Sequence, residues 1–410
     1  MDVRPFTPPF TYAPELPQQR HIIIRHPGYD DMSNVLLRLF APDAPSSSSS
    51  ASFGLHAGFA LTACGIVAGN RWDGWLSEHK HDDGGQDDPA RIALCAADWD
   101  KMLDKDSYYF HLPYDNDDDN NPSPYPIVPT FQEWAFPHNQ LPSSWTHIAL
   151  PEAYGQLLQT HTTPSLNTVL LLRDEVCAIS GCLTMLQTAH VCPKAEEEWY
   201  LRNGMSRYCS RRSAGLEDPV NVLRLRADLH IAFDKPYFVF VPKADGVGSQ
   251  QFVLHVVEPC VEYQHLYHNQ KIQQQREVCV ELLFARFAWT IFPLVADFLK
   301  GKVRRRLRLM TTSKDDGTKV APFFASAEQC ENLVMRRSKS RNTTSKKRAR
   351  LEDSAQYEVT DASLEDSVKD EVTDASLEDS VKDEVTDASL EDSVKDEVTD
   401  ASLEGKHDRS

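Results

Sequence analysis

Residues 177–243 read CAISGCLTMLQTAHVCPKAEEEWYLRNGMSRYCSRRSAGLEDPVNVLRLRADLHIAFDKPYFVFVPK, and this stretch decides the fold of the chain. A short strand pattern ends at His190, and a charged, irregular segment follows it. Asn221 precedes a second strand pattern, and a helical pattern that carries His230 and Asp234 comes directly after. Polar side chains suited to chemistry therefore occur in order on a strand end, a loop and a helix.

This order resembles the HNH (ββα-metal) endonuclease family, and in particular its fungal branch with the pattern AH…DxxN…LrxDLHxxFD. The chain carries AH at 189–190, DPVN at 218–221 and LRLRADLHIAFD at 223–234. The match covers about a sixth of the chain. The resemblance implies an α+β fold, in which an HNH-type ββα core is embedded in a larger α+β body and a disordered C-terminal tail follows.

The resemblance also implies a reaction, the hydrolysis of phosphodiester bonds in nucleic acid, with DNA as the first candidate. A phosphodiester is an anion that resists attack by hydroxide, so a nuclease needs a base and a divalent cation. Carried over from the family, His190 is the general base, Asn221 orients the loop, and His230 ligates Mg²⁺ or a similar divalent metal. Histidine suits the first role because its pKa lies near neutrality, and the last role as a neutral imidazole.

Several features of the family are missing from this chain. Many members place an aspartate before the first histidine as a second metal ligand, and here that position is Ala189. Many members also carry two CxxC zinc knuckles. Ser180 replaces the second cysteine of the first knuckle, and Arg226 and Leu229 occupy the other. Neither zinc site can form as the family builds it.

Asp234 is a candidate for the missing carboxylate ligand. It follows His230 by four residues, so both side chains lie on one face of the predicted helix. A simple helix-surface charge is the alternative.

Two other functions remain open because of these departures. One is a catalytically inactive nucleic-acid or chromatin-binding module that keeps the HNH scaffold without its metal. The other is a protein-binding scaffold that uses the acidic tail and the N-terminal region. The inactive binding module predicts retardation of DNA without cleavage, which distinguishes it from a nuclease. The protein-binding scaffold predicts neither retardation nor cleavage of DNA.

Composition bounds the class of protein. At 410 residues the chain can hold two or three domains, and its 41% hydrophobic content can fill substantial cores. The nine cysteines follow no framework spacing and the N-terminus lacks the apolar stretch of a secretory signal, which together indicate a reduced, intracellular protein. The net charge of -18 is concentrated in residues 351–410, which hold 21 acidic and 5 basic residues, so residues 1–350 carry only about -2.

The predicted organisation has five parts. They are an extended arm at 1–20; an uncharacterised α+β domain at 21–150 with an acidic insertion, a solvated loop, at 78–125; an HNH nuclease-like domain at 165–300 with a hairpin and a C-terminal helix; a basic segment at 301–350; and disordered acidic 13-residue repeats at 351–410.

Hydrophobic patterns predict further elements around the HNH-like stretch. Strands are expected at His21–Arg25 and Val35–Phe40, a buried helix from Phe59, and a hairpin of Tyr237–Val241 with Phe252–Val257. The AGNRWDGWL block that follows the buried helix predicts a packing and turn motif.

A long apolar helix is expected over Glu277–Leu299, with a kink at Pro293. We do not expect it to span a membrane, because Glu281, Arg286 and Asp297 interrupt its apolar sequence.

Charge runs near the C-terminus predict location and partners. The basic runs 302–308 and 346–350, the second with Arg336-Arg337 upstream, include a pattern that looks like a bipartite nuclear-import signal and predict a nuclear protein. The same charges could neutralise phosphates of nucleic acid. The tail repeat EVTDASLEDSVKD has no helical apolar stripe and is predicted to be disordered, with tail-binding proteins as possible partners.

Overall fold

The computed structural model describes residues 19–43, 53–81, 91–113, 124–146, 148, 166–245, 248–272, 278–313 and 317–335, with side chains for all of these except 167, 168, 171, 172, 311–313 and 317–320. All of the described residues belong to one compact unit, within residues 1–351. The import-like signal, the tail repeats and the predicted boundary between residues 150 and 165 lie outside the described residues.

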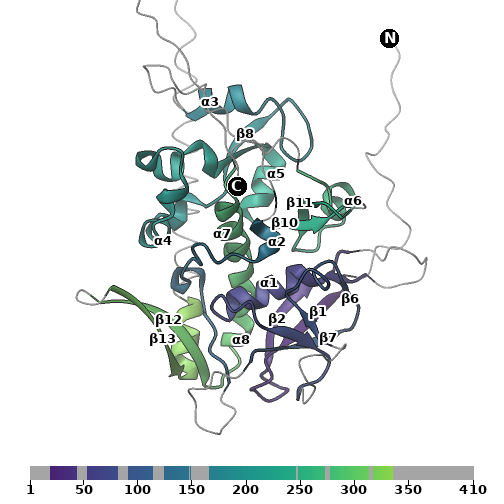
Figure 1. The fold of residues 1–410 in the computed structure, drawn as a ribbon, viewed down its shortest axis with the longest axis vertical. Helices are drawn as coiled ribbons and strands as arrows, with labels where there is room; N and C mark the ends of the chain where they lie inside the picture. The colour runs from purple at the N-terminus through teal and green to yellow at the C-terminus, as the bar shows by residue number, and fades with distance from the viewer. Residues whose placement is uncertain are drawn as a thin grey trace, which may run out of the picture. The chain divides into compact units, whose positions relative to one another are not determined.

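A five-stranded mixed sheet forms the N-terminal part of the first unit (Figure 1). Its strand order is β2-β1-β7-β4-β5, and of its four pairings only that of β1 with β7 is parallel. The strands are β1 His21–Arg25, β2 Val35–Phe40, β4 Trp75–Ser77, β5 Ile92–Ala93 and β7 Ser107–His111. The predictions of β1 and β2 are confirmed, and alternate side chains such as Ile22 and Ile24 point into the core.

The predicted acidic insertion is not only a solvated loop, because β7 belongs to it. This strand lies in the middle of the sheet, between β1 and β4. It buries Tyr108 and Phe110 to 3% and 1% exposure. Strand β6, Met102–Leu103, also lies in this region and pairs with β3, Leu55–His56. Strand β7 was not predicted because its two buried aromatic side chains, Tyr108 and Phe110, alternate along the strand but are outnumbered by the polar residues around them.

Helix α1, Ala57–Val67, is buried on every side. Two of its glycines allow aromatic rings to approach the helix backbone: a Cβ on Gly58 would lie 2.6 Å from Trp99, and one on Gly65 would lie 2.6 Å from Trp72. Trp72 belongs to the AGNRWDGWL block, so this block packs against α1.

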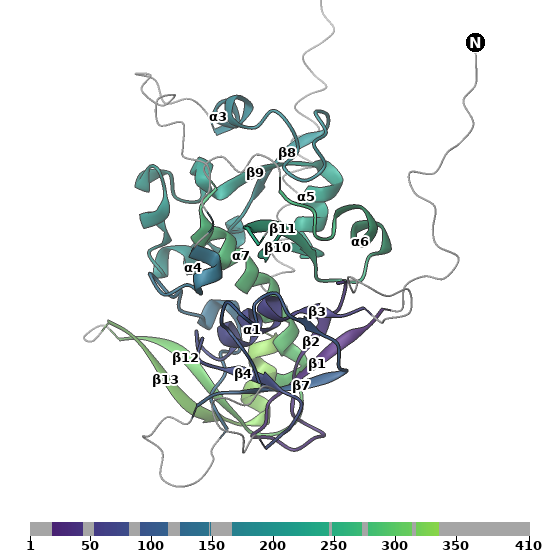
Figure 2. The ribbon, with the colours of Figure 1, turned by 45° about the vertical axis from the view of Figure 1, so that its right-hand side comes forward.

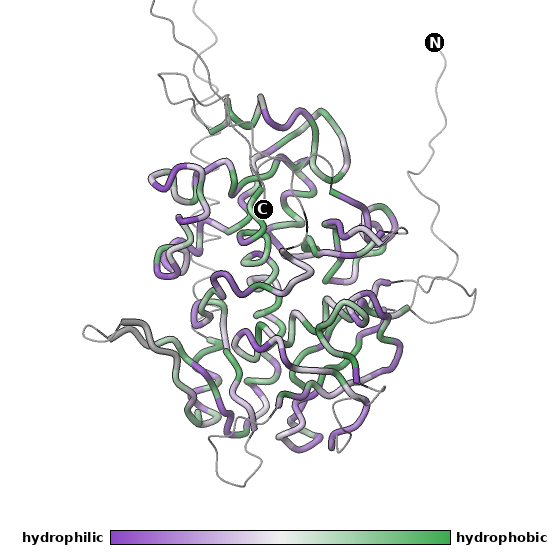
Figure 3. The backbone as a smooth tube through the Cα atoms, in the orientation of Figure 1, coloured by the Kyte–Doolittle hydropathy of each residue, from purple (hydrophilic) through white to green (hydrophobic). Residues whose placement is uncertain are grey.

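Helix α7, Val280–Ile291, runs through the middle of the described part of this unit and contacts α1, α2 (Ser143–Thr146) and β10 (Figures 1 and 2). At the predicted kink position the α-helix gives way to the 3-10 turn η6, Phe292–Val295, which contains Pro293 and leads into α8, Ala296–Leu299. The combined helix is long and apolar enough to cross a membrane, but 78% of its apolar window is buried inside the structure. Figure 3, in the orientation of Figure 1, shows much of this helix in the green of hydrophobic residues. Such burial is typical of the core helix of a globular protein.

The segment that carries the candidate residues contains two paired strands and a helix. Strand β8, Leu186–His190, pairs antiparallel with β9, Val222–Arg226, and α5, Ala227–Asp234, lies against both. The connection between the strands holds α4 and four 3-10 turns: η2 Lys194–Glu196, α4 Glu197–Arg202, η3 Met205–Tyr208, η4 Arg212–Glu217 and η5 Pro219–Asn221. Helix α3, Leu166–Arg173, precedes β8.

The predicted hairpin after α5 is observed as β10, Phe238–Ala244, paired antiparallel with β11, Gln250–Val256. Helix α6, Val261–Tyr267, follows it and contacts β11. Residues 124–142, which precede α2, contain the turn η1, Phe131–Glu133, and aromatic side chains of this stretch join the core. In particular, Trp134 stacks on Trp199 with ring centroids 5.6 Å apart.

A second hairpin, β12 Arg305–Ser313 with β13 Gly317–Ala325, occupies part of the basic segment, and the sequence did not predict it (Figure 2). Residues 327–335 are helical. Arg305 is only 1% exposed, and its guanidinium lies 3.7 Å from the ring centroid of Phe298 and 4.6 Å from that of Tyr29. One charge of the basic run is therefore structural.

The fully buried His26 gives the fold a measurable pH dependence. Its Nε2 donates to the Tyr125 carbonyl at 3.0 Å, and its Nδ1 accepts from the Gly28 N–H at 3.0 Å, so a second proton would break a hydrogen bond. Burial, together with the nearby Arg305 charge, lowers the pKa of His26 from 6.5 to about 3. Because the folded pKa lies below the unfolded pKa, the stabilisation is fully present above about pH 6.5 and is lost as the pH falls toward about 3.

The free energy of unfolding should therefore fall between pH 7.5 and pH 5.5, as measured by guanidinium denaturation. In a His26→Phe variant, which keeps a ring against Tyr125, the fall should be smaller by about 1.4 kcal/mol, the contribution of one such histidine over this interval. An equal fall in both proteins would show that His26 does not titrate on unfolding.

Candidate functional site

His190 is the last residue of β8, where its backbone pairs with Val222 of β9. The side chain is 14% exposed. Its Nε2 is buried and has no hydrogen-bond partner among the described residues; the Glu217 Oε2 atom, at 3.5 Å, makes a charge contact longer than a hydrogen bond. Burial, followed by the Lys194 charge, lowers the pKa of His190, and Glu217 only partly offsets this. The ring is therefore neutral near pH 7 and can accept a proton.

Asn221 is fully buried and braces the loop beside His190. Its Oδ1 accepts from the Cys192 N–H at 2.8 Å, while its Nδ2 donates to the carbonyls of Cys192 and Leu216 at 3.2 and 2.9 Å. Its own carbonyl accepts from the Val191 N–H at 2.7 Å. The carboxamide thus fixes the backbone that directly follows His190, and it has a positioning role in this geometry.

His230 projects from α5 and is oriented by Gln187 of β8. The Gln187 Oε1 atom lies 2.9 Å from Nδ1 of the ring. Since an amide oxygen only accepts, Nδ1 carries the proton and Nε2 carries the lone pair. This nitrogen faces Asp234, whose Oδ2 is 3.6 Å away. The His230 charge is also one of the causes that lower the pKa of His190, so the two imidazoles are close enough to interact electrostatically.

The His230–Asp234 pair fits a shared divalent cation. Nitrogen and oxygen donors bound to one ion at about 2.1 Å each lie about 3.0 to 3.4 Å apart at octahedral or tetrahedral angles. The observed 3.6 Å is close to this range. A hydrogen bond donated by the other ring nitrogen, here from Nδ1 to Gln187 Oε1, is the usual support of a metal-binding histidine.

The absent zinc knuckles are replaced by hydrogen bonds. The Ser180 and Arg226 N–H groups donate to Cys177 Sγ at 3.4 and 3.3 Å, and the Arg226 guanidinium lies 3.6 Å from Cys182 Sγ. Hydrogen bonds of the Ser180 and Arg226 side chains lower the pKa of the Cys182 thiol. Arg226 is itself held by Asp228 through two contacts of 2.6 and 2.7 Å. The turn before β8 is therefore fixed without a metal.

Three residues near the site were not predicted: Glu217, Gln187 and Arg286. Arg286 reaches from α7 to the Phe233 carbonyl and to the Val191 carbonyl at 3.4 Å, so it ties the end of α5 to the residue after His190. Its guanidinium stacks on Phe233 at 3.7 Å. The sequence signal for Arg286 is a charge inside an apolar helix, a pattern that speaks against a membrane span but does not identify the partners of the charge. Glu217 and Gln187 gave no signal of their own.

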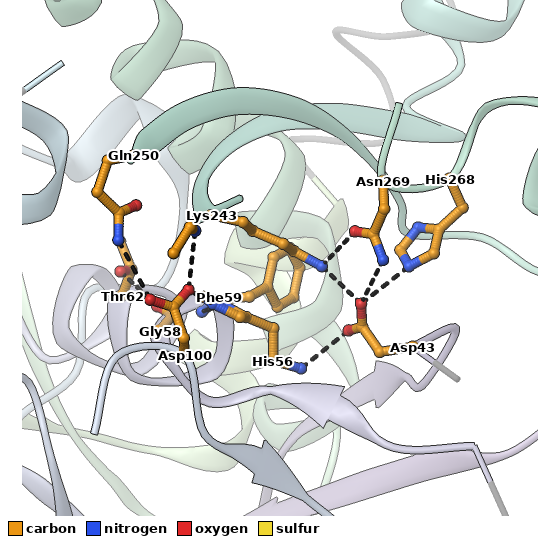
Figure 4. A network of polar contacts seen from close by, with 11 residues as sticks. Asp43, His56, Gly58, Phe59, Thr62, Asp100, Lys243, Gln250, His268 and Asn269 are labelled. Atoms are coloured by element: carbon orange, nitrogen blue, oxygen red, sulfur yellow. Dashed lines mark hydrogen bonds and ion pairs between the residues drawn. The ribbon is translucent and has the colours of Figure 1, made fainter. Parts of the chain in front are cut away.

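A second titratable cluster lies away from these residues, between the N-terminal part and the hairpin β10–β11 (Figure 4). Asp43, His255 and His268 place one possible ligand atom each within 4.8 Å of one another. Within the described part of the chain, these three residues form the group of histidine, cysteine and acidic side chains that is close enough to hold a metal ion. The cation there is Lys243, whose Nζ lies 2.6 Å from Asp43 Oδ1. His268 Nε2 lies 3.0 Å from the same oxygen, and Nδ1 accepts from the Val256 N–H.

This cluster does not fit a metal. Because Nδ1 of His268 accepts a hydrogen bond, its Nε2 must carry the proton and donates to Asp43 in place of binding an ion. Burial raises the pKa of Asp43, but the Lys243 charge and the His268 hydrogen bond outweigh it and hold the pKa well below its usual value. The cluster is thus a buried ion pair that joins distant parts of the chain.

Comparison with known proteins gives a match for the segment that carries His190. Residues 177–241 match a family model, HNH_2, described as HNH endonuclease. The segment is accordingly an HNH endonuclease domain, which indicates nuclease activity and nucleic-acid binding in general. Neither curated proteins nor solved structures give a significant match to the chain.

Proposed function

We propose that this protein is an HNH-type endonuclease that hydrolyses phosphodiester bonds, with DNA as its first candidate substrate. One observation carries the proposal. The buried Nε2 of His190, with no hydrogen-bond partner among the described residues, belongs to a site that also holds the oriented His230–Asp234 pair.

His190 acts as the general base in this proposal. A water molecule beside the phosphodiester gives its proton to Nε2, which burial keeps neutral near pH 7. Glu217, 3.5 Å from this atom, stabilises the imidazolium that forms, and Lys194 holds Glu217 in place. Asn221 keeps the backbone after His190 fixed, so the ring does not need to be reoriented for each reaction.

His230 and Asp234 are the residues that would hold a divalent metal such as Mg²⁺. When bound, the ion supplies positive charge that offsets the charge developing on the phosphate. Two protein ligands leave positions for water and phosphate oxygens, which suits Mg²⁺ because this ion retains several waters. With no aspartate at position 189, Asp234 is the carboxylate that the structure offers beside His230.

A nuclear location is also proposed. It is supported by the basic runs at 302–308 and 346–350, although Arg305 of the first run is buried and so unavailable to an import receptor. Nuclear DNA is the substrate that this location would provide.

Removal of divalent metal should abolish cleavage of supercoiled plasmid DNA by the full chain. We expect nicked and linear products with Mg²⁺ or Mn²⁺ and none with excess EDTA, with recovery after the metal is restored. Gel retardation of the same plasmid without any product under all metal conditions would instead favour the inactive binding module.

A further inference from the structure

The connection between His190 and Asn221 contains a strongly basic stretch. Residues 202–216 hold four arginines and no acidic residue; the arginines are Arg202, Arg207, Arg211 and Arg212. The stretch lies inside the HNH endonuclease domain. Three of these side chains, Arg202, Arg207 and Arg212, are exposed.

Arg207 and Arg212 line an open pocket of about 430 Å³ together with Gly204 and Ser206. Gly204 has a left-handed backbone with φ of 59°, which turns the chain at the end of α4. The Nε of Arg207 donates to the Gly204 carbonyl at 3.3 Å, so this guanidinium is held over the turn. The pocket therefore presents one fixed arginine and a second arginine from η4.

Neither arginine is neutralised by a carboxylate in the described residues. Several other arginines of this chain are neutralised by a carboxylate. These ion pairs are Arg71–Asp73 at 2.8 Å, Arg173–Asp174 at 2.5 Å and Arg226–Asp228 at 2.6 Å. Two unneutralised guanidinium groups at one pocket attract an anion, and their planar donor arrays match the oxygens of a phosphate group.

We propose that this pocket binds a backbone phosphate of the nucleic-acid substrate, and that Arg207 and Arg212 share that phosphate. The inference rests on the proposed nuclease function and adds the site that holds the substrate strand. The connection to the catalytic residue is short: η4 begins at Arg212 and ends at Glu217, whose carboxylate contacts His190. Five residues span at most about 18 Å. One DNA strand rises about 3.4 Å per nucleotide, so the bound phosphate lies within about five nucleotides of Glu217.

The test is the salt dependence of DNA binding by the Arg207→Gln/Arg212→Gln double variant. Both variant and reference carry His190→Ala so that a fluorescent duplex stays intact, and affinity is measured by anisotropy at several salt concentrations. We expect about a tenfold weaker affinity at low salt. The slope of log K against log salt should fall by about 0.9, the value for one phosphate. Because the two arginines share one phosphate, Arg207→Gln alone and Arg212→Gln alone should each show most of the loss of DNA affinity seen in the double variant.

The matched control removes the same number of positive charges elsewhere, through Arg38→Gln and Lys105→Gln, both of which are exposed in the N-terminal part. The control should keep the reference slope. A double variant with unchanged affinity and slope would overturn the pocket while leaving the nuclease proposal intact. Failure of the reference protein to bind DNA at all would overturn both.

Inorganic phosphate is the second probe, because a free phosphate has the same chemistry as the backbone group. At constant ionic strength it should displace the duplex only at millimolar concentration. Displacement by micromolar phosphate from the reference, but not from the double variant, would assign the pocket to a free phosphate and overturn the proposal.

Discussion

Replacing Lys243 by methionine is expected to lower the free energy of unfolding by about 3–5 kcal/mol. The side chain is 9% exposed and its partner Asp43 is 5% exposed, so the change leaves a buried carboxylate without its cation. Asn269 and His268 still donate to Asp43 Oδ1, at 3.1 and 3.0 Å, but neither neutral donor compensates the charge. Urea denaturation of the full chain measures the loss.

Lys101→Met is the matched control for this prediction. The Lys101–Asp98 pair has the same length, 2.6 Å, but Lys101 is 47% exposed, so its loss should cost less than about 1 kcal/mol. Asp43→Asn combined with Lys243→Met should cost less than the sum of the two single changes, because no uncompensated charge remains. Equal losses in Lys243→Met and Lys101→Met would remove the structural role that we assign to the buried pair.

The candidate site shows what local sequence can predict. The positions of His190 and His230 followed from short-range patterns, a strand ending in one histidine and a helix carrying the other. Asp234 could be placed on the face of His230 from its four-residue spacing alone. These predictions needed no knowledge of how distant segments pack.

The supporting contacts could not be predicted because folding brings them from far away in sequence. Arg286 lies 95 residues from Val191, and Lys243 lies 200 residues from Asp43. A single aspartate after a strand, or one lysine in a hairpin, has no local pattern that identifies its partner. The strand at 107–111 and the hairpin from Arg305 were missed for a related reason, since their burial comes from packing against other segments.

Replacing His190 by alanine is expected to lower the rate of DNA cleavage by about 10²–10⁴-fold, the contribution of a positioned general base. The fold should be retained because the ring makes no hydrogen bond through its buried Nε2 to any described residue. DNA affinity should also persist, since the basic stretch at 202–216 is unchanged. Added imidazole should restore part of the rate by occupying the space of the missing ring, an effect that a purely structural role would not produce.

The most direct test is the rate of plasmid cleavage at saturating Mg²⁺ by the wild-type chain, His190→Ala and the control His21→Ala, which changes an exposed histidine of β1. DNA affinity is measured on the same samples. We predict that wild type and His21→Ala cleave at the same rate, and that His190→Ala binds DNA equally well but cleaves at least 100-fold more slowly. Equal cleavage by His190→Ala and wild type would contradict the assignment of the catalytic base and, with it, the proposed site.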